Sequence, residues 1–217
     1  MTSIDEQWPK GTPERAVADA FSAFRRRDVA RLAAGATPAS IRALAVRVGP
    51  ELDTGDARTP ASSTGDPTDS QAASLLGRVV ASLPEVFTDS VRCLIVGRVL
   101  ESRLVDARPD GRGLIGLDCR VTSADDEWLS IRGDRQIHRD IANAVAGVAH
   151  VVFRVAHEFP GQGIVPFPPE LQVATTQLVS GEWKLVLDEW SDVGLPGFRG
   201  IGFWIDERST TEAATDD

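Results

Sequence analysis

The stretch RCLIVGRVLESRLV, from Arg92 to Val105, decides the fold class of this 217-residue chain. Its density of Val, Ile and Leu predicts a strand that is buried on both faces. The turn signal Asp110-Gly111 follows, and the next apolar stretch, Leu114 to Thr122, predicts a strand that pairs back as a hairpin. An antiparallel sheet is therefore expected to begin here.

Helices are expected before this hairpin, and further strands after it. Thr12 is a suitable N-cap, Pro13 suits the first helical position, and Glu14 favours the positive end of the helix dipole. Helices followed by a run of antiparallel strands indicate an α+β fold rather than alternating βαβ units. The other expected elements are helices at 28–35, 37–48 and 70–83, an amphipathic helix at 133–146, and strands at 150–159, 171–179 and 182–190. A tight turn at Ser180-Gly181 is expected to join the last two strands.

Two stretches are interpreted as insertions into a single domain that spans residues 12–205. The first, at about 49–70, holds three Pro, three Gly and almost no large apolar residue. The second, at about 123–147, holds the amphipathic helix, with Asp134 as its expected N-cap. The acidic residues 206–217 are expected to form a flexible tail.

Three phrases of the sequence carry a family resemblance. TPERAV (residues 12–17) opens the first helix, AHVVFRV (149–155) lies in a middle strand, and GEWKL (181–185) lies in the closing hairpin. Together they resemble the nuclear-transport-factor-2-like superfamily, which includes ketosteroid isomerases and SnoaL-type cyclases. The resemblance implies a cone-shaped α+β barrel, in which N-terminal helices pack in a curved antiparallel sheet and leave a pocket. It also implies a homodimer formed through the outer face of the sheet.

The chemistry of the best-known members does not carry over to this chain. Ketosteroid-isomerase-like and scytalone-dehydratase-like members depend on tyrosines, and this sequence contains no tyrosine. No catalytic residue is therefore transferred from the family. A shared scaffold also says little about activity, because such scaffolds host many unrelated functions.

Composition excludes several classes of protein. A net charge of −9 argues against a nucleic-acid binder, because phosphate backbones require a basic surface. No apolar run approaches the ~18 residues of a membrane span, and the first residues do not resemble a secretory signal. Cys93 and Cys119 are expected to be buried, reduced thiols. A cytoplasmic protein without membrane contact is the expectation.

Neither a cofactor nor a metal is expected. The phrase GRGLIG, from Gly111 to Gly116, matches the dinucleotide-binding fingerprint, but it leads into a strand and not into a helix N-terminus. We therefore interpret it as a hairpin turn. The three histidines, His138, His150 and His157, lack the spacing of a zinc-binding motif, and no cysteine cluster accompanies them.

The candidate site lies on the strand that begins near residue 150. Strand alternation puts His150 and Arg154 on one face, roughly 13 Å apart, so they are expected to hold two ends of one small ligand. His150 would act as general acid or base and Arg154 would hold an anionic group, with Asp118 as the supporting carboxylate. Alternatively, this face is the outer, solvated or dimer-forming side, where His, Arg and Glu form cross-strand ion pairs.

Two functions follow from these expectations. The first is a protein that binds a small apolar or weakly anionic molecule, with acid–base isomerisation, dehydration or hydrolysis as the available chemistry. The second is a non-catalytic, dimeric interaction module whose interior is filled by side chains. Whether the chain is an enzyme stays open, and an open cavity lined by ionisable groups would favour the first function.

Overall fold

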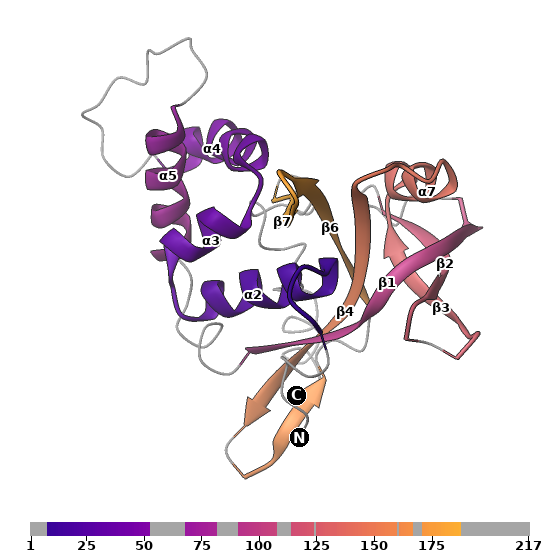
Figure 1. The fold of residues 1–217 in the computed structure, drawn as a ribbon. Helices are drawn as coiled ribbons and strands as arrows, with labels where there is room; N and C mark the ends of the chain where they lie inside the picture. The colour runs from indigo at the N-terminus through magenta and orange to yellow at the C-terminus, as the bar shows by residue number, and fades with distance from the viewer. Residues whose placement is uncertain are drawn as a thin grey trace, which may run out of the picture.

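In the computed structural model, the described residues are 8–52, 68–81, 91–107, 114–123, 125–159, 161–166 and 171–187. Helices come first and strands follow, which confirms the α+β prediction (Figure 1). None of the described helices is long and apolar enough to cross a bilayer. The helices are α2 (Pro13–Arg25), α3 (Val29–Gly35), α4 (Pro38–Leu52), α5 (Asp69–Ala81) and α7 (Arg135–Ala142). The strands are β1 (Val91–Asp106), β2 (Ile115–Val121), β3 (Trp128–Gly133), β4 (Val148–Phe159), β5 (Gly163–Pro166), β6 (Gln172–Val179) and β7 (Glu182–Leu185).

The expected helix caps are present. The backbone N–H of Arg15 donates to the Thr12 side chain (3.3 Å) at the start of α2, and the N–H of Ile137 donates to Asp134 (2.6 Å) at the start of α7. Each cap satisfies one of the backbone donors that a helix N-terminus leaves unpaired. Local sequence signals therefore located both helix starts.

The two expected insertions differ from their predicted form. Helix α4 continues through Gly49 and Pro50 to Leu52, so it covers the first residues of the stretch at 49–70. Residues 53–67 lie outside the described residues, as do residues 188–217 with the expected tail. The stretch at 123–147 contributes a strand that the sequence reading missed, β3, in addition to helix α7. It therefore builds part of the sheet.

The sheet is antiparallel, and its strand order is β3-β2-β1-β4-β6-β7, with β5 paired to β4. The predicted hairpin of β1 and β2 is present, with Ser102 opposite Cys119. The predicted turn between β6 and β7 is present as well, with φ of 52° at Ser180 and 84° at Gly181. Two successive positive φ angles match the right-handed twist of a hairpin. The described strands thus form an open sheet with β3 and β7 at its edges.

Strand β1 changes its partner along its length. Its first half pairs with β4 as far as Arg98, which lies opposite Val151, and its second half pairs with β2 from Val99 onward. A register shift between Ile95 and Gly97 precedes the change. The strand therefore carries β2 and β3 away from β4, as the divergence of these strands in Figure 1 shows.

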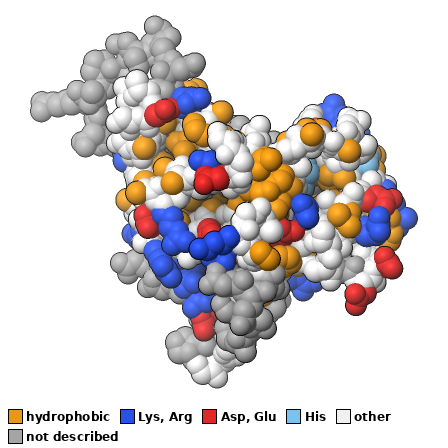
Figure 2. Space-filling model, viewed as in Figure 1, with side chains coloured by type: hydrophobic (Ala, Val, Ile, Leu, Met, Phe, Trp, Pro, Cys, Tyr) orange, Lys and Arg blue, Asp and Glu red, His pale blue; other side chains and the backbone are white. Residues whose placement is uncertain are grey.

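Strand β4 is covered on both faces by two separate hydrophobic cores. Val151 and Phe153 pack in the core formed with helices α2–α5, whereas Val152 packs in the core formed with β2, β3 and α7. The predicted alternation of β4 is therefore confirmed at these three positions. Hydrophobic side chains also gather on the visible surface between the helical part and the part that contains α7, with histidine atoms at their margin (Figure 2).

The structure predicts that Gly97 tolerates no side chain. A Cβ atom there would lie 2.8 Å from Ser123 Oγ, 2.9 Å from Thr122 Oγ1 and 3.1 Å from the Ser123 backbone nitrogen. We expect Gly97→Ala to lower the free energy of unfolding by about 1–3 kcal/mol, measured by urea denaturation. The control Gly35→Ala lies in a helix with no atom within 4 Å of the new Cβ and should leave stability unchanged or slightly raised. Equal stability of the two variants would contradict the close approach at Gly97.

Candidate functional site

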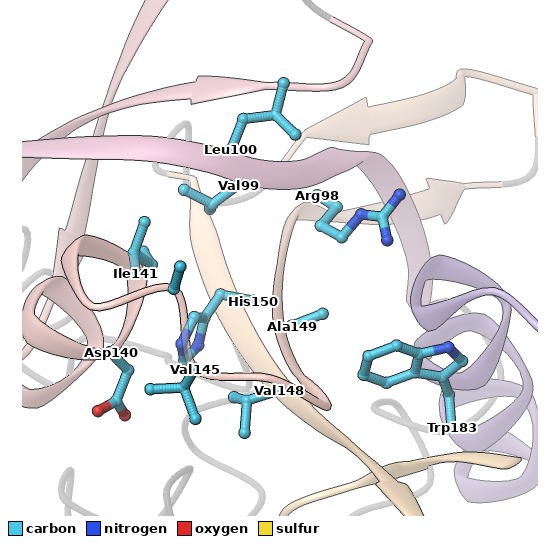
Figure 3. Close-up of a pocket in the computed structure, with 11 residues that line it drawn as sticks. Arg98, Val99, Leu100, Asp140, Ile141, Val145, Val148, Ala149, His150 and Trp183 are labelled. Carbon is cyan, nitrogen blue, oxygen red and sulfur yellow. The ribbon is translucent and has the colours of Figure 1, made fainter. Parts of the chain in front are cut away.

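A pocket lies where β1 leaves β4. Beyond the pair Arg98–Val151 the two strands diverge, and helix α7 with the loop that follows it lies beside the gap (Figure 3). The cavity has a volume of about 170 Å³. Its lining is mostly apolar but includes three ionisable side chains. The lining residues are Arg98, Val99, Leu100, Asp140, Ile141, Ala144, Val145, Val148, Ala149, His150 and Trp183.

Helix α7 forms one wall of the pocket because two kinds of contact hold it against the sheet. Ile137 and Ile141 pack against the core that contains Val99 and Val152. His138 forms a hydrogen bond between its Nδ1 and Ser102 Oγ on β1 (2.8 Å). These contacts place the C-terminal end of α7 beside the start of β4.

His150 is the most buried ionisable group of the pocket, with 3% of its surface exposed. Its Nδ1 is 3.0 Å from Oγ1 of Thr175, which lies directly opposite on β6. Its Nε2 is also buried, and no described residue forms a hydrogen bond with it. A buried polar atom without a partner costs about 1–3 kcal/mol, so this nitrogen is an unusual feature of the fold.

Burial lowers the pKa of His150 below its ordinary value, because the low-dielectric surroundings disfavour the charged imidazolium. The carboxylates of Asp140 and Asp134 act in the opposite direction with smaller effect. Both carboxylates belong to α7 or its cap, so α7 brings negative charge to the histidine. The ring is therefore neutral at neutral pH.

Arg98 and Trp183 lie on the opposite side of His150 from Asp140 in Figure 3. The Nε of Arg98 is buried, and no described residue accepts a hydrogen bond from it. The nearest carboxylate is that of Glu14 on α2, at 3.7 Å, and the Glu14 side chain is only 4% exposed. Glu14 therefore offsets much of the arginine charge without satisfying its Nε donor.

Arg154 and Asp118 are not brought to His150. Arg154 is exposed and lines a different cavity, of about 530 Å³, which Trp128 and Leu171 also line. Asp118 accepts hydrogen bonds from Ser130 (2.7 Å) and Arg103 (3.0 Å). The Ser130 bond, followed by Arg103, lowers the pKa of Asp118. The expectation that Asp118 would support His150 is thus corrected, since Asp140 and Asp134 supply the nearby carboxylates.

The alternative interpretation was that the His150 face of β4 is an outer, solvated face with cross-strand ion pairs. It applies to only part of the strand. Glu158 forms a cross-strand ion pair with Arg92, as expected for a solvated face. His150, in contrast, is buried beside α7. The contrast arises because α7 covers the start of β4, which strand alternation cannot reveal.

Metal and thiol chemistry find no support in the described part of the chain. No group of three or more His, Cys, Asp or Glu side chains there could hold a metal ion. Cys93 and Cys119 are free thiols, as expected. Burial raises the pKa of both, that of Cys119 to about 12, so neither is a reactive thiolate at neutral pH.

In comparisons with known proteins, no family model matches the chain, and no curated protein or solved structure matches it.

The electrostatics of the pocket predict how His150 titrates. Its pKa, followed by NMR of the imidazole protons, should lie below the reference value of about 6.5. Asp140→Asn should lower the pKa further, because it removes a carboxylate that stabilises the imidazolium. Asp118→Asn serves as the control and should leave it unchanged, since Asp118 bonds to Ser130 and Arg103. A pKa at or above 6.5, or one that responds to Asp118 and not to Asp140, would contradict this description.

Proposed function

We propose that this chain binds a small molecule in the pocket between β1, β4 and α7, and that His150 forms a hydrogen bond with it. The observation that carries the proposal is the buried Nε2 of His150, which has no partner among the described residues and belongs to a residue that lines a cavity. A ligand that forms a hydrogen bond with this nitrogen would remove the free-energy cost of burying it without a partner. Binding would then complete the hydrogen bonding of the pocket.

The size of the cavity limits the ligand. A cavity of about 150 Å³ holds a benzene molecule. The present cavity, about 170 Å³, therefore suits one six-membered ring with one or two small substituents. Its lining combines aliphatic side chains and Trp183 with Arg98, Asp140 and His150, which favours a ring that carries a polar substituent.

The neutral state of His150 determines which chemistry is open to the site. A neutral imidazole with an unoccupied nitrogen can accept a proton from a bound molecule or from water. Acid–base isomerisation, dehydration and hydrolysis all include such a transfer, and they are the reactions we propose if the ligand is turned over. The hydrogen bond to Thr175 would keep the ring oriented during the transfer.

We also propose the nuclear-transport-factor-2-like cone as the fold family. The order of elements supports it, because helices α2–α5 precede and pack against an antiparallel sheet. The space between these helices and the sheet is filled by side chains such as Phe24 and Phe153. The proposed site therefore lies at the divergence of β1 and β4 and not beneath the helices.

The second candidate function is a non-catalytic module that dimerises through the sheet. Exposed apolar side chains on β1, namely Leu94, Leu104 and Val105, favour it, because exposed apolar residues are suited to contact with a partner. The cavity with its ionisable lining favours small-molecule binding as the leading proposal. The homodimer itself stays a prediction, and it is compatible with either function.

Phenol is a suitable first probe, because it combines one ring with one hydroxyl group. At ten times its Kd, phenol is expected to raise the free energy of unfolding by about 1.4 kcal/mol, which a thermal-shift measurement detects as a higher Tm. His150→Asn should weaken this effect, because asparagine can still pair with Thr175 but places no atom at the position of Nε2. Equal stabilisation of the wild type and of His150→Asn would contradict the proposed role of His150.

A further inference from the structure

We propose that the chain has a second ligand site, in the cavity lined by Arg154, and that this site binds an apolar monocarboxylate about the size of two fused rings. The Arg154 guanidinium would hold the carboxylate, and the apolar part would lie against Leu129, Ile131 and Leu171. The inference is independent of the pocket at His150, because the two cavities share no lining residue in the described part of the chain.

The cavity lies at the margin of the second hydrophobic core. Leu171 and Ile131 belong to this core, Leu129 packs against it, and all three also line the cavity. Val152 on β4 is buried in the same core, and Arg154 follows two residues later, so strand alternation directs both side chains to one face. An arginine therefore lies where the apolar face of β4 reaches the cavity.

The charge of Arg154 has no partner among the described residues. Arg154 is exposed, and it forms neither an ion pair nor a hydrogen bond with any side chain in the described ranges. Glu158, on the same face of β4, pairs with Arg92, and Asp118, on β2, pairs with Arg103. An arginine binds a carboxylate through two parallel N–H donors, so a ligand carboxylate suits this position.

The other charges near the cavity limit the ligand to a single negative charge. Glu127 and Arg132 also line the cavity and offset each other, so Arg154 makes the lining net positive. Asp125 and Asp126, in the segment before β3, are exposed and lie outside the lining, and salt screens their effect. These acidic residues disfavour a dianion such as a phosphate ester. A monocarboxylate matches the one uncompensated cation.

The volume and the apolar lining define the rest of the ligand. At about 530 Å³, the cavity falls within the range of about 300–1,000 Å³ that is usual for small-molecule sites. A cavity of about 150 Å³ holds one benzene ring, so this cavity has room for two fused rings and a carboxylate. Trp128 adds an aromatic side chain to the lining, which favours a flat aromatic ligand.

Four probes test the ligand class: 2-naphthoate, its neutral analogue 2-naphthamide, its cationic analogue 2-naphthylmethylammonium, and acetate. Each is titrated into the ¹⁵N-labelled full chain at pH 7.5, and the amide chemical shifts are followed. We expect 2-naphthoate to bind about three- to fivefold more tightly than 2-naphthamide, as for a partly exposed ion pair. The ammonium compound should bind most weakly of the three naphthalenes, and acetate should not bind, because it lacks the apolar part. The shift changes should concentrate at residues 128–132 and at Leu171.

Variants assign the two kinds of contact to their residues. Arg154→Met keeps an apolar stem and removes the charge, so it should abolish the preference for 2-naphthoate over 2-naphthamide, whereas Arg154→Lys should keep it. Arg26→Met, at an exposed position just after α2, is the matched control and should leave the preference unchanged. Leu129→Ala should weaken 2-naphthoate and 2-naphthamide by a similar factor, because it removes apolar contact only.

Several outcomes would overturn the inference. Equal affinity for 2-naphthoate and 2-naphthamide, or a preference that survives in Arg154→Met, would remove the role of Arg154. Tightest binding of the ammonium compound would show that the acidic residues near β3 dominate, and acetate binding as tightly as 2-naphthoate would remove the apolar part. If no naphthalene binds, or if the shift changes concentrate at α7 and the start of β4, the cavity at Arg154 is not the site. None of these results decides whether phenol binds at His150, which its own thermal-shift measurement tests.

Discussion

The partner change of β1 near Gly97 is the constraint on which the rest of the structure depends. Gly97 lies close to Thr122 and Ser123 at the end of β2, and a side chain there would meet them at under 3 Å. The strand can therefore leave β4 after Arg98 and pair with β2. This divergence puts a second core on the face of β4 opposite the helices, and it opens the gap that becomes the pocket.

The pocket depends equally on how α7 is held. A helix of eight residues has little stability of its own, so its position comes from packing. Ile137 and Ile141 reach the second core, and the hydrogen bond between Ser102 and His138 links α7 to β1. The helix both buries His150 and brings Asp140 and Asp134 toward it. Burial is the larger of the two effects, which keeps the ring neutral and able to accept a proton.

The sequence predicted the features that local chemistry determines. Caps at Thr12 and Asp134, the β1–β2 hairpin and the turn at Ser180-Gly181 are set by neighbouring residues, and all are present. Of the three candidate site residues His150, Arg154 and Asp118, only His150 lines the pocket in the structure. Its neighbours Arg98, Asp140, Thr175 and Trp183 come from four other segments, so strand alternation could not bring them together. Asp118 was expected nearby, although it alternates with the buried Leu117 and Cys119 on β2 and so lies on the opposite face.

The most direct test of the central claim is the pattern of NOEs along β1 in isotopically labelled protein. Cross-strand NOEs to β4 should end at the pair Arg98–Val151, and NOEs to β2 should begin at Val99. The ring protons of His150 should show NOEs to the methyl groups of Ile141 and Val145, which line the same pocket. NOEs between the backbones of Leu100 and Ala149, in a ladder that continues from Arg98, would close the gap and contradict the account.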